Sequence, residues 1–236
     1  MQPYFFPYTG YFSLIKHTDK WIVFDNVQYI ERGWINRNRI IHPTMPEPMY
    51  ITVPLKKHQE TIISDIKINY GRDYPRNILS QIAAAYKKRA PYYKEIFGLV
   101  EAVLTTHFED IVSLNVEAMR HVCSYLEIPF EYQIFSKMDI QIDDIFGPGD
   151  WAFNICKAMN ADGYINPVSG QDLFDPLKFK NAGISLEFLK ISQMQYPQKK
   201  AVFLDNLSII DVLMFNSPKD VHVMLDHITL ISGKEV

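Results

Sequence analysis

The sequence has little of what marks several large classes of protein. It contains only two cysteines in 236 residues, Cys123 and Cys156, and no CxxC motif. This speaks against a disulfide scaffold and against a cysteine-based zinc site. No apolar run approaches the roughly 18 residues that a membrane-spanning helix needs, and no signal peptide is visible. We therefore expect a protein of the cytoplasm.

The chain also has no large excess of either positive or negative charge. The chain has 24 Lys and Arg against 27 Asp and Glu, a formal net charge of −3, and its longest basic run is Lys87-Lys88-Arg89. Binding to nucleic acid depends on a concentrated basic surface that neutralises phosphates. The composition therefore predicts no nucleic-acid surface.

Several sequence motifs that indicate phosphate binding, metal binding or a catalytic nucleophile are also absent. There is no GxGxxG or GxxxxGK[ST] phosphate loop and no HExxH, and the seven histidines are scattered. A GxSxG motif is absent too, although a triad built from residues far apart in the chain stays open. The sequence predicts no metal site and assigns no cofactor.

Aromatic residues are what the chain has in excess. They make up 14% of the sequence, with 14 Tyr and 15 Phe, while apolar residues at 47% and charged residues at 22% are ordinary for a globular protein. Large aromatic side chains fill cores and line clefts that bind rings. We therefore expect a large core together with an aromatic-lined cleft.

The order of patterns along the chain predicts the α/β class, with a mixed or largely parallel sheet, flanking helices and a helical insertion. We divide the chain into an N-terminal α/β part (1–71), a helical block (72–128) and a C-terminal α/β part of the same domain (129–236). Helical spacing favours helices at 11–16, 74–86, 91–104, 111–126, 149–159 and 208–215, and a short one after Asp175-Pro176. Strands are expected at 20–29, 49–55, 130–135, 163–166 and 184–189, with a further candidate at 62–68.

The first forty residues hold the densest set of candidate ligand-binding groups. Pro3 and Pro7 fix φ in a loop, and Gly10 permits a tight turn or a close approach before a helix. Gln2 can donate to and accept from sugar hydroxyls or a base edge. A sugar ring or base could stack on four aromatic residues, each of which could equally belong to the core: Tyr4, Tyr8, Tyr11 and Trp34.

Polar residues follow the first apolar strand. The run Trp21-Ile22-Val23-Phe24 breaks at Asp25, and Asn26 and Gln28 come next. In open α/β sheets, ligands bind beyond the carboxyl ends of the strands. We therefore expect Asp25 and Gln28 to belong to a site.

The segment from Trp34 to Ile40 carries two arginines at alternate positions, so a strand there would place both positive charges on one face. On a strand, alternation would give one face to Trp34, Asn36 and Asn38 and the other face to Arg37 and Arg39. Two guanidinium groups on one face form planar forks that suit a phosphate or a carboxylate. The alternative is an edge strand whose arginines are solvated or paired with Asp25 and Glu31.

Two further features lie in the last third of the chain. Turn-forming residues surround a predicted strand end, and they explain most of this group: Asp162, Tyr164, Asn166, Ser169, Gly170 and Asp172. A ligand could also be held there, in which case Tyr164, Asn166 and Gly170 should meet the N-terminal motif in one pocket. Asp211 is either a solvated residue or a buried carboxylate with a partner such as an arginine.

Taken together, these motifs resemble the WbqC-like family of bacterial proteins. The resemblance is carried by QPYFFPYTGYFSLI, VFDNVQY, RGWINRNRI, ADGYINP and LSIID, and it covers nearly the whole chain. Similar proteins normally have a short apolar strand before the Gln-Pro dipeptide, whereas here Met1 directly precedes Gln2. We therefore expect that first strand to be missing and the edge of its neighbour to be exposed.

The resemblance implies a link to bacterial surface polysaccharides of the O-antigen type. One hypothesis is a transferase that moves an acyl or aminoacyl group onto a nucleotide- or lipid-linked amino sugar. Asp25 would then orient or deprotonate the amine, Arg37 and Arg39 would hold an anionic group, and Gln2, Asn36 and Asn38 would position the sugar. The other hypothesis is a non-catalytic protein that binds the same glycan intermediate or a partner protein.

Overall fold

The computed structural model describes residues 1–56, 61–71, 73–192 and 194–233. Contacts divide the chain into two compact units, Met1–Lys137 with Gln193–Leu225, and Met138–Ser192 with Asp226–Val236. The predicted segment 129–236 therefore contributes to both units. Helices and small parallel and mixed sheets alternate along the chain, which confirms the α/β class.

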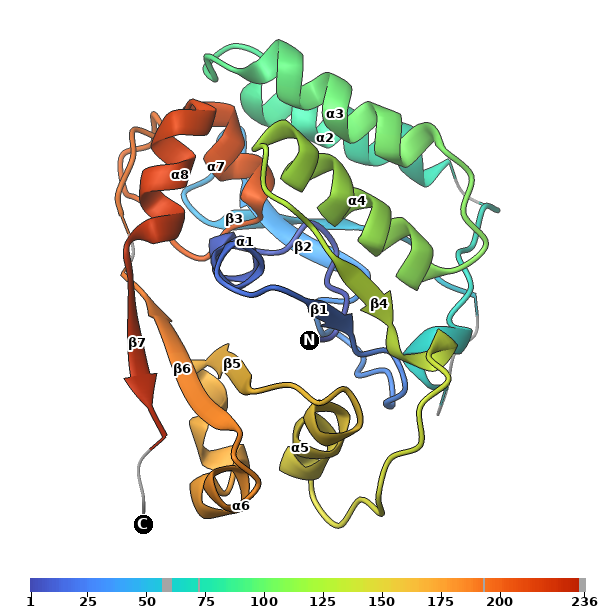
Figure 1. Cartoon of the computed structure of the whole chain (residues 1–236). Coiled ribbons are helices and arrows are strands. Elements are labelled where there is room, and N and C mark those ends of the chain that lie inside the picture. The colour runs from blue at the N-terminus through green and yellow to red at the C-terminus, as the bar shows by residue number, and fades with distance from the viewer. Residues whose placement is uncertain (57–60, 72, 193, 234–236) are drawn as a thin grey trace. The chain divides into compact units, whose positions relative to one another are not determined.

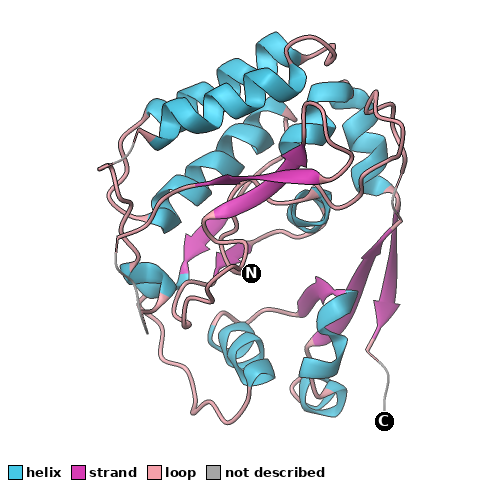
Figure 2. Cartoon of the chain, turned by 180° about the vertical axis from the view of Figure 1, so that it is seen from behind, coloured by secondary structure: helices cyan, strands magenta, loops and turns pink. Residues whose placement is uncertain are grey.

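The first unit contains two pairs of strands. β1 (Trp21–Val23) and β4 (Tyr132–Ile134) pair in parallel, and β2 (Arg37–Ile41) and β3 (Pro48–Thr52) pair antiparallel. Figure 2, which shows the chain from behind, has the second pair crossing in front of the helices of this unit. Its other regular elements are α1 (Thr9–Lys16), η1 (Ile63–Asp65), α2 (Tyr74–Tyr86), α3 (Tyr93–Thr105), α4 (Ile111–Tyr125), η2 (Phe135–Lys137), α7 (Ile209–Phe215) and α8 (Pro218–Asp226).

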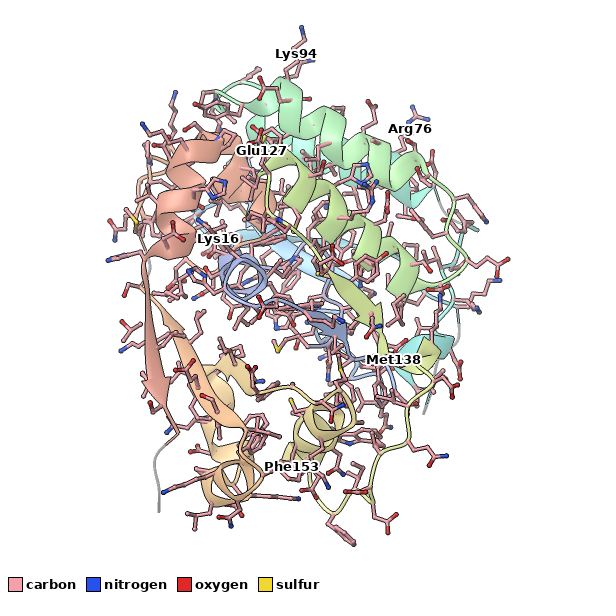
Figure 3. The ribbon with its side chains drawn as sticks, in the orientation of Figure 1. Lys16, Arg76, Lys94, Glu127, Met138 and Phe153 are labelled. Atoms are coloured by element: carbon pink, nitrogen blue, oxygen red, sulfur yellow. The ribbon has the colours of Figure 1, made fainter. Side chains whose placement is uncertain are left out.

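The helical block at 74–125 follows the start signals in its sequence. The Asp73 and Asp110 side chains accept hydrogen bonds from the amides of the first turns of α2 and α4, and Pro75 fits the first turn of α2. The apolar faces of the three helices are buried, and α2, α3 and α4 lie side by side in Figure 1. Arg76 and Lys94 project away from the opposite faces in Figure 3, which leaves a polar outer surface.

Met1 lies against the edge of β1 that faces away from β4. Its amine donates to the Ile22 carbonyl at 2.8 Å, and the Phe24 amide donates to the Met1 carbonyl at 2.8 Å. Backbone groups of alternate residues point to opposite sides of a strand, and the Trp21 amide points to β4. Met1 therefore covers a stretch of the edge that we expected to be exposed.

The second unit is a three-stranded sheet with helices on it. Its strand order is β5-β6-β7, with β5 (Gly163–Pro167) parallel and β7 (Ile228–Ser232) antiparallel to the central β6 (Ser185–Ile191). The helices are α5 (Pro148–Ala158), η3 (Val168–Leu173) and α6 (Pro176–Asn181). Buried side chains of these elements form its own core: Phe153, Cys156, Phe179, Ile184, Leu186 and Phe188.

Some expected elements differ from the observed ones. The candidate strand at 62–68 was wrong, since η1 occupies its centre and only isolated bridges flank it. The strand expected at 20–29 ends at Val23, because the chain turns where the Asp25 side chain bonds to η2. Two elements, α8 and β7, were not expected. None of the described helices combines the length and apolar character that a membrane crossing requires.

Candidate functional site

The N-terminal loop, residues 2–8, is shaped by side chains from distant elements. The Asn38 amide on β2 donates to the carbonyls of Phe5 (3.0 Å) and Phe6 (2.8 Å), and the Ser208 hydroxyl donates to Phe6 at 2.7 Å. Phe6 itself has a positive φ of 40°, which these bonds hold in place. Both amide hydrogens of Asn38 are thus engaged by the loop. Its predicted role in substrate binding stays a prediction, but its observed contacts position the loop.

Two more asparagines join this scaffold. Asn115 on α4 is fully buried and donates to the carbonyls of Pro3 and Ile35, each at 2.7 Å. Asn36 accepts from the Tyr29 hydroxyl and donates to the Val53 carbonyl, each at 2.8 Å. Asn36, a predicted sugar-binding residue, is therefore engaged on both sides of its amide by the protein.

Three tyrosines of the loop and α1 pack on one another. Tyr11 is buried, stacks on Tyr4 at 5.1 Å between ring centroids, meets Tyr8 edge-on, and donates to the Gln2 carbonyl at 3.1 Å. Burial raises the pKa of all three hydroxyls, so they stay protonated at neutral pH. A Cβ on Gly10 would lie 2.4 Å from the Tyr8 ring, so glycine allows that ring to fold over the start of α1. Tyr4 and Tyr8 are half-buried and are the accessible ones of the three tyrosines in the predicted stacking wall.

Asp25 connects the ends of β1 and β4. The side chain is 1% exposed, and its two oxygens accept from the amide (2.9 Å) and the hydroxyl (2.6 Å) of Ser136. Its backbone carbonyl accepts from the Ser64 amide at 3.0 Å. A substrate amine would reach this carboxylate only after the Ser136 contact opened, so the catalytic role stays a prediction. Gln28 is exposed at the bridge to Ile62.

Arg37 and Arg39 lie on the half-buried face of β2, while Asn38 between them is buried. The Arg37 guanidinium lies 4.4 Å from the centroid of the Tyr50 ring, and the Arg39 guanidinium lies 5.4 Å from that of Trp34. The two rings stack at 6.3 Å with 26° between their planes. We call these four side chains, Trp34, Arg37, Arg39 and Tyr50, the guanidinium face.

The expected position of Trp34 was wrong. Alternation placed it with the asparagines, but β2 begins only at Arg37, and the bends before it turn the indole to the arginine side. Tyr50 of β3 lies directly opposite Arg39 in the antiparallel register, and sequence reasoning missed it. Its place could have been found only by pairing the two strands correctly, because side chains opposite each other share a face.

The guanidinium groups bond to carbonyl oxygens rather than to carboxylates. Arg37 donates to the Gly33 carbonyl at 3.1 Å and to that of Arg32, and Arg39 donates to the Asn206 carbonyl at 3.2 Å. The buried Nε of Arg39 has no hydrogen-bond partner in the part of the chain that the structure describes. Across the described ranges, no carboxylate forms an ion pair with either arginine. The face thus carries two positive charges that the described protein leaves without a counter-ion.

The other predicted group lies in the second unit. The Asn166 amide donates to the Tyr164 hydroxyl at 2.6 Å, and the Tyr164 ring stacks on Phe179 of that unit's core. A Cβ on Gly170 would come within 2.6 Å of Asn166 Oδ1, so any other residue there would force the Asn166 side chain to shift. These three residues therefore come together as expected. Their meeting with the N-terminal motif, which belongs to the other unit, stays a prediction.

Asp211, in the first turn of α7, is the most buried carboxylate among the described residues of the first unit. Its exposed fraction is 0%, and it accepts from the hydroxyls of Tyr86 and Tyr196, each at 2.7 Å, and from Gln198 Nε2 at 2.9 Å. We call these four residues the Asp211 cluster. The sequence left an inward-facing Asp211 open and suggested an arginine partner. The side chain is inward, but its partners are two phenols and a carboxamide.

Burial raises the pKa of Asp211 to about 6, although its three donors and Lys200 favour the ionised form. The pKa of Tyr86 and of Tyr196 is raised as well, chiefly by burial and then by the adjacent carboxylate. Neither phenol can therefore ionise readily to act as a nucleophile. Metal ligation has no support here, because the described residues contain no group of three or more histidine, cysteine or acidic side chains arranged to hold an ion.

A segment of loop connects the Asp211 cluster to the guanidinium face. Within residues 196–206, Gln198 exchanges hydrogen bonds with the Leu204 backbone at 2.7 and 2.8 Å. Lys200 donates to the carbonyls of His42, at 3.1 Å, and Met45. The segment ends at Asn206, whose carbonyl accepts a hydrogen bond from the Arg39 guanidinium.

Comparison with known proteins agrees with this interpretation of the motifs. The sequence matches the WbqC-like protein family over residues 2–223. The chain belongs to the WbqC-like family. It is also 27% identical over 224 residues to Uncharacterized protein Rv1507c of Mycobacterium tuberculosis, covering 92% of this chain and 91% of the relative. No solved structure matches significantly. The guanidinium face and the Asp211 cluster both lie within the part that matches the WbqC-like family.

Sequence reasoning missed most partners of this site. Tyr86, Tyr196 and Gln198 were not singled out, because they lie 125, 15 and 13 positions from Asp211 in the chain. The one available signal was Asp211 itself, a carboxylate within the apolar run of α7. A buried carboxylate needs donors, and this requirement predicts that partners exist without naming them.

Proposed function

We propose that this protein is an enzyme of bacterial surface-polysaccharide biosynthesis, of the O-antigen type. In this proposal it transfers an acyl or aminoacyl group onto an amino sugar that carries a nucleotide or lipid diphosphate. The observation that carries the proposal is the guanidinium face, where two arginines without carboxylate partners lie against two stacked rings.

The chemistry of this face suits a ligand with both charge and a ring. Diphosphates and carboxylates accept paired hydrogen bonds from guanidinium groups, and Arg39 Nε is a buried donor with no partner among the described residues. Tyr50, at 43% exposed, offers ring surface beside the charges. A nucleotide-linked sugar supplies an anion and stacking groups in one molecule.

The proposed transfer balances as follows. The amine nitrogen of the sugar attacks the carbonyl carbon of an activated donor such as a thioester, the carbon–sulfur bond breaks, and the thiol leaves. The amine proton passes through a base to the departing sulfur. Asp25 is the base candidate, and Asp25→Asn removes basicity while keeping an acceptor for Ser136.

Binding is the first test. Titration calorimetry with uridine diphosphate and with inorganic pyrophosphate should detect binding. Arg37→Lys and Arg39→Lys should each weaken it by about 1–3 kcal/mol for every charge-assisted hydrogen bond that the substitution removes. The matched control is Arg76→Lys, since Arg76 lies on the outer face of α2 (Figure 3). Equal affinity in all three variants would remove the support of the guanidinium face.

Turnover is the second test, and it separates the two hypotheses. Mass spectrometry should detect an acylated sugar after incubation with a uridine-diphosphate amino sugar and a panel of acyl and aminoacyl thioesters. Binding without product across that panel would favour the alternative, a non-catalytic protein that binds a glycan intermediate or a partner. Retained turnover in Asp25→Asn would remove Asp25 from the catalytic role.

A further inference from the structure

We infer that Asp211 is a positioning residue for Arg39, and that it acts through the 196–206 segment. This rests on the proposed anion-binding role of the guanidinium face and names a residue that would control it. Asp211 itself is buried in the first turn of α7 and takes no part in the face.

Hydrogen bonds, joined by a short stretch of backbone from Leu204 to Asn206, lead from Asp211 to Arg39. Asp211 accepts hydrogen bonds from the Tyr196 hydroxyl at 2.7 Å and from Gln198 Nε2 at 2.9 Å. Both donors lie near the start of the segment. Gln198 binds both backbone groups of Leu204, at 2.7 and 2.8 Å, which closes the segment into a compact loop. Two residues later, the Asn206 carbonyl accepts from Arg39 at 3.2 Å.

The backbone of Arg39 is fixed by β2 and by the Ser208 amide, but few contacts with the described residues orient its guanidinium group. Its guanidinium donates one hydrogen bond, to Asn206, and lies on one ring, that of Trp34, and its buried Nε is without a partner among the described residues. Asn206 adopts a positive φ of 49°, a conformation that asparagine tolerates better than most residues but that the surroundings must still maintain. Release of the segment would therefore free the carbonyl that aims the arginine.

The burial of Asp211 excludes a direct catalytic role. It is 0% exposed and is surrounded by three donors, so no substrate atom can reach it while the segment is closed. Tyr196 is half-buried, but its raised pKa makes it a poor base or nucleophile. The geometry suits a group that holds other groups in place.

The titratable and charged groups that face Asp211 are few. They are Tyr86 from α2 and Tyr196 and Lys200 from the segment, and Lys200 in turn interacts with Arg89 and Glu47. Burial dominates over the donors, so the pKa of Asp211 is about 6 with the segment closed. An opened segment would return it to water and to the usual pKa of about 4. Closure therefore binds a proton, and it becomes more favourable as the pH falls from about 6 to about 4.

The first test measures anion binding against pH, with sulfate as the probe because its charge is constant in this range. Sulfate affinity of the unmodified chain should rise as the pH falls through about 6, and Asp211→Asn, which mimics the protonated carboxyl, should give a flat profile. Tyr196→Phe should weaken binding about threefold at neutral pH. The control Tyr70→Phe also removes a hydrogen bond, to the Phe108 carbonyl, but should leave affinity unchanged. An unaltered pH profile in Asp211→Asn would overturn the inference.

The second test needs no ligand. The NMR signal of Arg39 Nε–H, identified by its disappearance in Arg39→Lys, should broaden and exchange faster with solvent in Tyr196→Phe and stay unchanged in Tyr70→Phe. If the chain binds neither sulfate, pyrophosphate nor uridine diphosphate, the proposed function fails while this signal still tests the positioning. A signal that is the same in Tyr196→Phe and the unmodified chain overturns the positioning alone.

Discussion

The Asp211 cluster and the guanidinium face use charge in opposite ways. In the cluster, one carboxylate is fully buried and every partner is a neutral donor of the protein, two phenols and one carboxamide. On the face, two guanidinium groups stay half-buried, bond to backbone carbonyls and lie on aromatic rings without a described counter-ion.

This difference indicates which charges serve the fold. A buried ionised group is tolerated only when its hydrogen-bonding capacity is filled, and breaking that arrangement is strongly destabilising. Stacked and partly solvated guanidinium groups contribute little to folding, because water can replace a partner that is removed. The larger losses of stability should therefore follow changes in the cluster, and the larger losses of anion affinity should follow changes on the face.

The largest effect is expected from Asp211→Ala. Removal of the carboxylate leaves two buried phenols and a carboxamide without an acceptor, which should lower the free energy of unfolding by about 3–5 kcal/mol. Chemical denaturation measures this value, with Asp172→Ala, an exposed aspartate, as the control within about 0.5 kcal/mol. A loss below about 1 kcal/mol would show that the cluster does not stabilise the fold.

A second effect comes from pH. Because the folded pKa of Asp211 is about 6, the folded protein keeps a proton that the unfolded chain loses above about 4. The stabilising contribution is complete below about pH 4 and is lost as the pH rises through 6, about 3 kcal/mol in total. The difference in unfolding free energy between the unmodified chain and Asp211→Asn isolates this effect from that of other carboxylates. A difference that does not vary with pH would contradict the raised pKa.

A third prediction tests whether the Asp25 carboxylate serves the fold or the function. Asp25→Ala removes the acceptor of the Ser136 amide and hydroxyl and should cost about 1–2 kcal/mol, less than Asp211→Ala because Ser136 is exposed and water can replace the carboxylate. Ser136→Ala keeps the hydrogen bond from the backbone amide to Asp25, so it should lower the free energy of unfolding by less than Asp25→Ala does. If Asp25→Ala leaves stability unchanged but abolishes turnover, Asp25 belongs with the functional charges.

The smallest change in stability is expected on the guanidinium face. Tyr50→Leu removes the ring beneath Arg37 but keeps apolar bulk at a position 43% exposed, so the melting temperature should barely move. Affinity for uridine diphosphate should fall by about 0.5–1 kcal/mol, the usual contribution of an exposed cation–ring contact. Tyr50→Phe keeps the ring and is the matched control. Unfolding of Tyr50→Leu without a change in affinity would mark the face as structural.

Sequence reasoning succeeded where the pattern is local. The helices at 74–86 and 111–125 combine regular apolar spacing with aspartate caps, and each signal lies within a few residues of its effect. The alternation of Arg37, Asn38 and Arg39 was likewise predicted correctly. The signal for α8 was also present, since Ser217 and Asp220 bond to each other at its start, but it was overlooked.

It failed where contacts join distant parts of the chain. Trp34 was assigned to the wrong face because it lies in a bent segment before β2, where its carbonyl accepts from the distant Phe5 amide. Asn38 and Asn115 were not seen as holders of that loop, because their acceptors lie 33 and 112 positions away. The polarity of Asn38 suggested a ligand contact, whereas the carbonyls that its amide satisfies belong to the protein itself.

The interleaved course of the chain has a consequence for how the protein forms during synthesis. The sheet of the second unit takes β5 and β6 from residues 163–191, but its third strand, β7, comes from 228–232, after the chain has completed α7 and α8 of the first unit. A two-stranded pair is marginal in isolation. As the polypeptide emerges from the ribosome, the edge of β6 that pairs with β7 therefore stays open until residues 228–232 have been translated. During that interval the edge presents unpaired backbone groups with which another chain could pair.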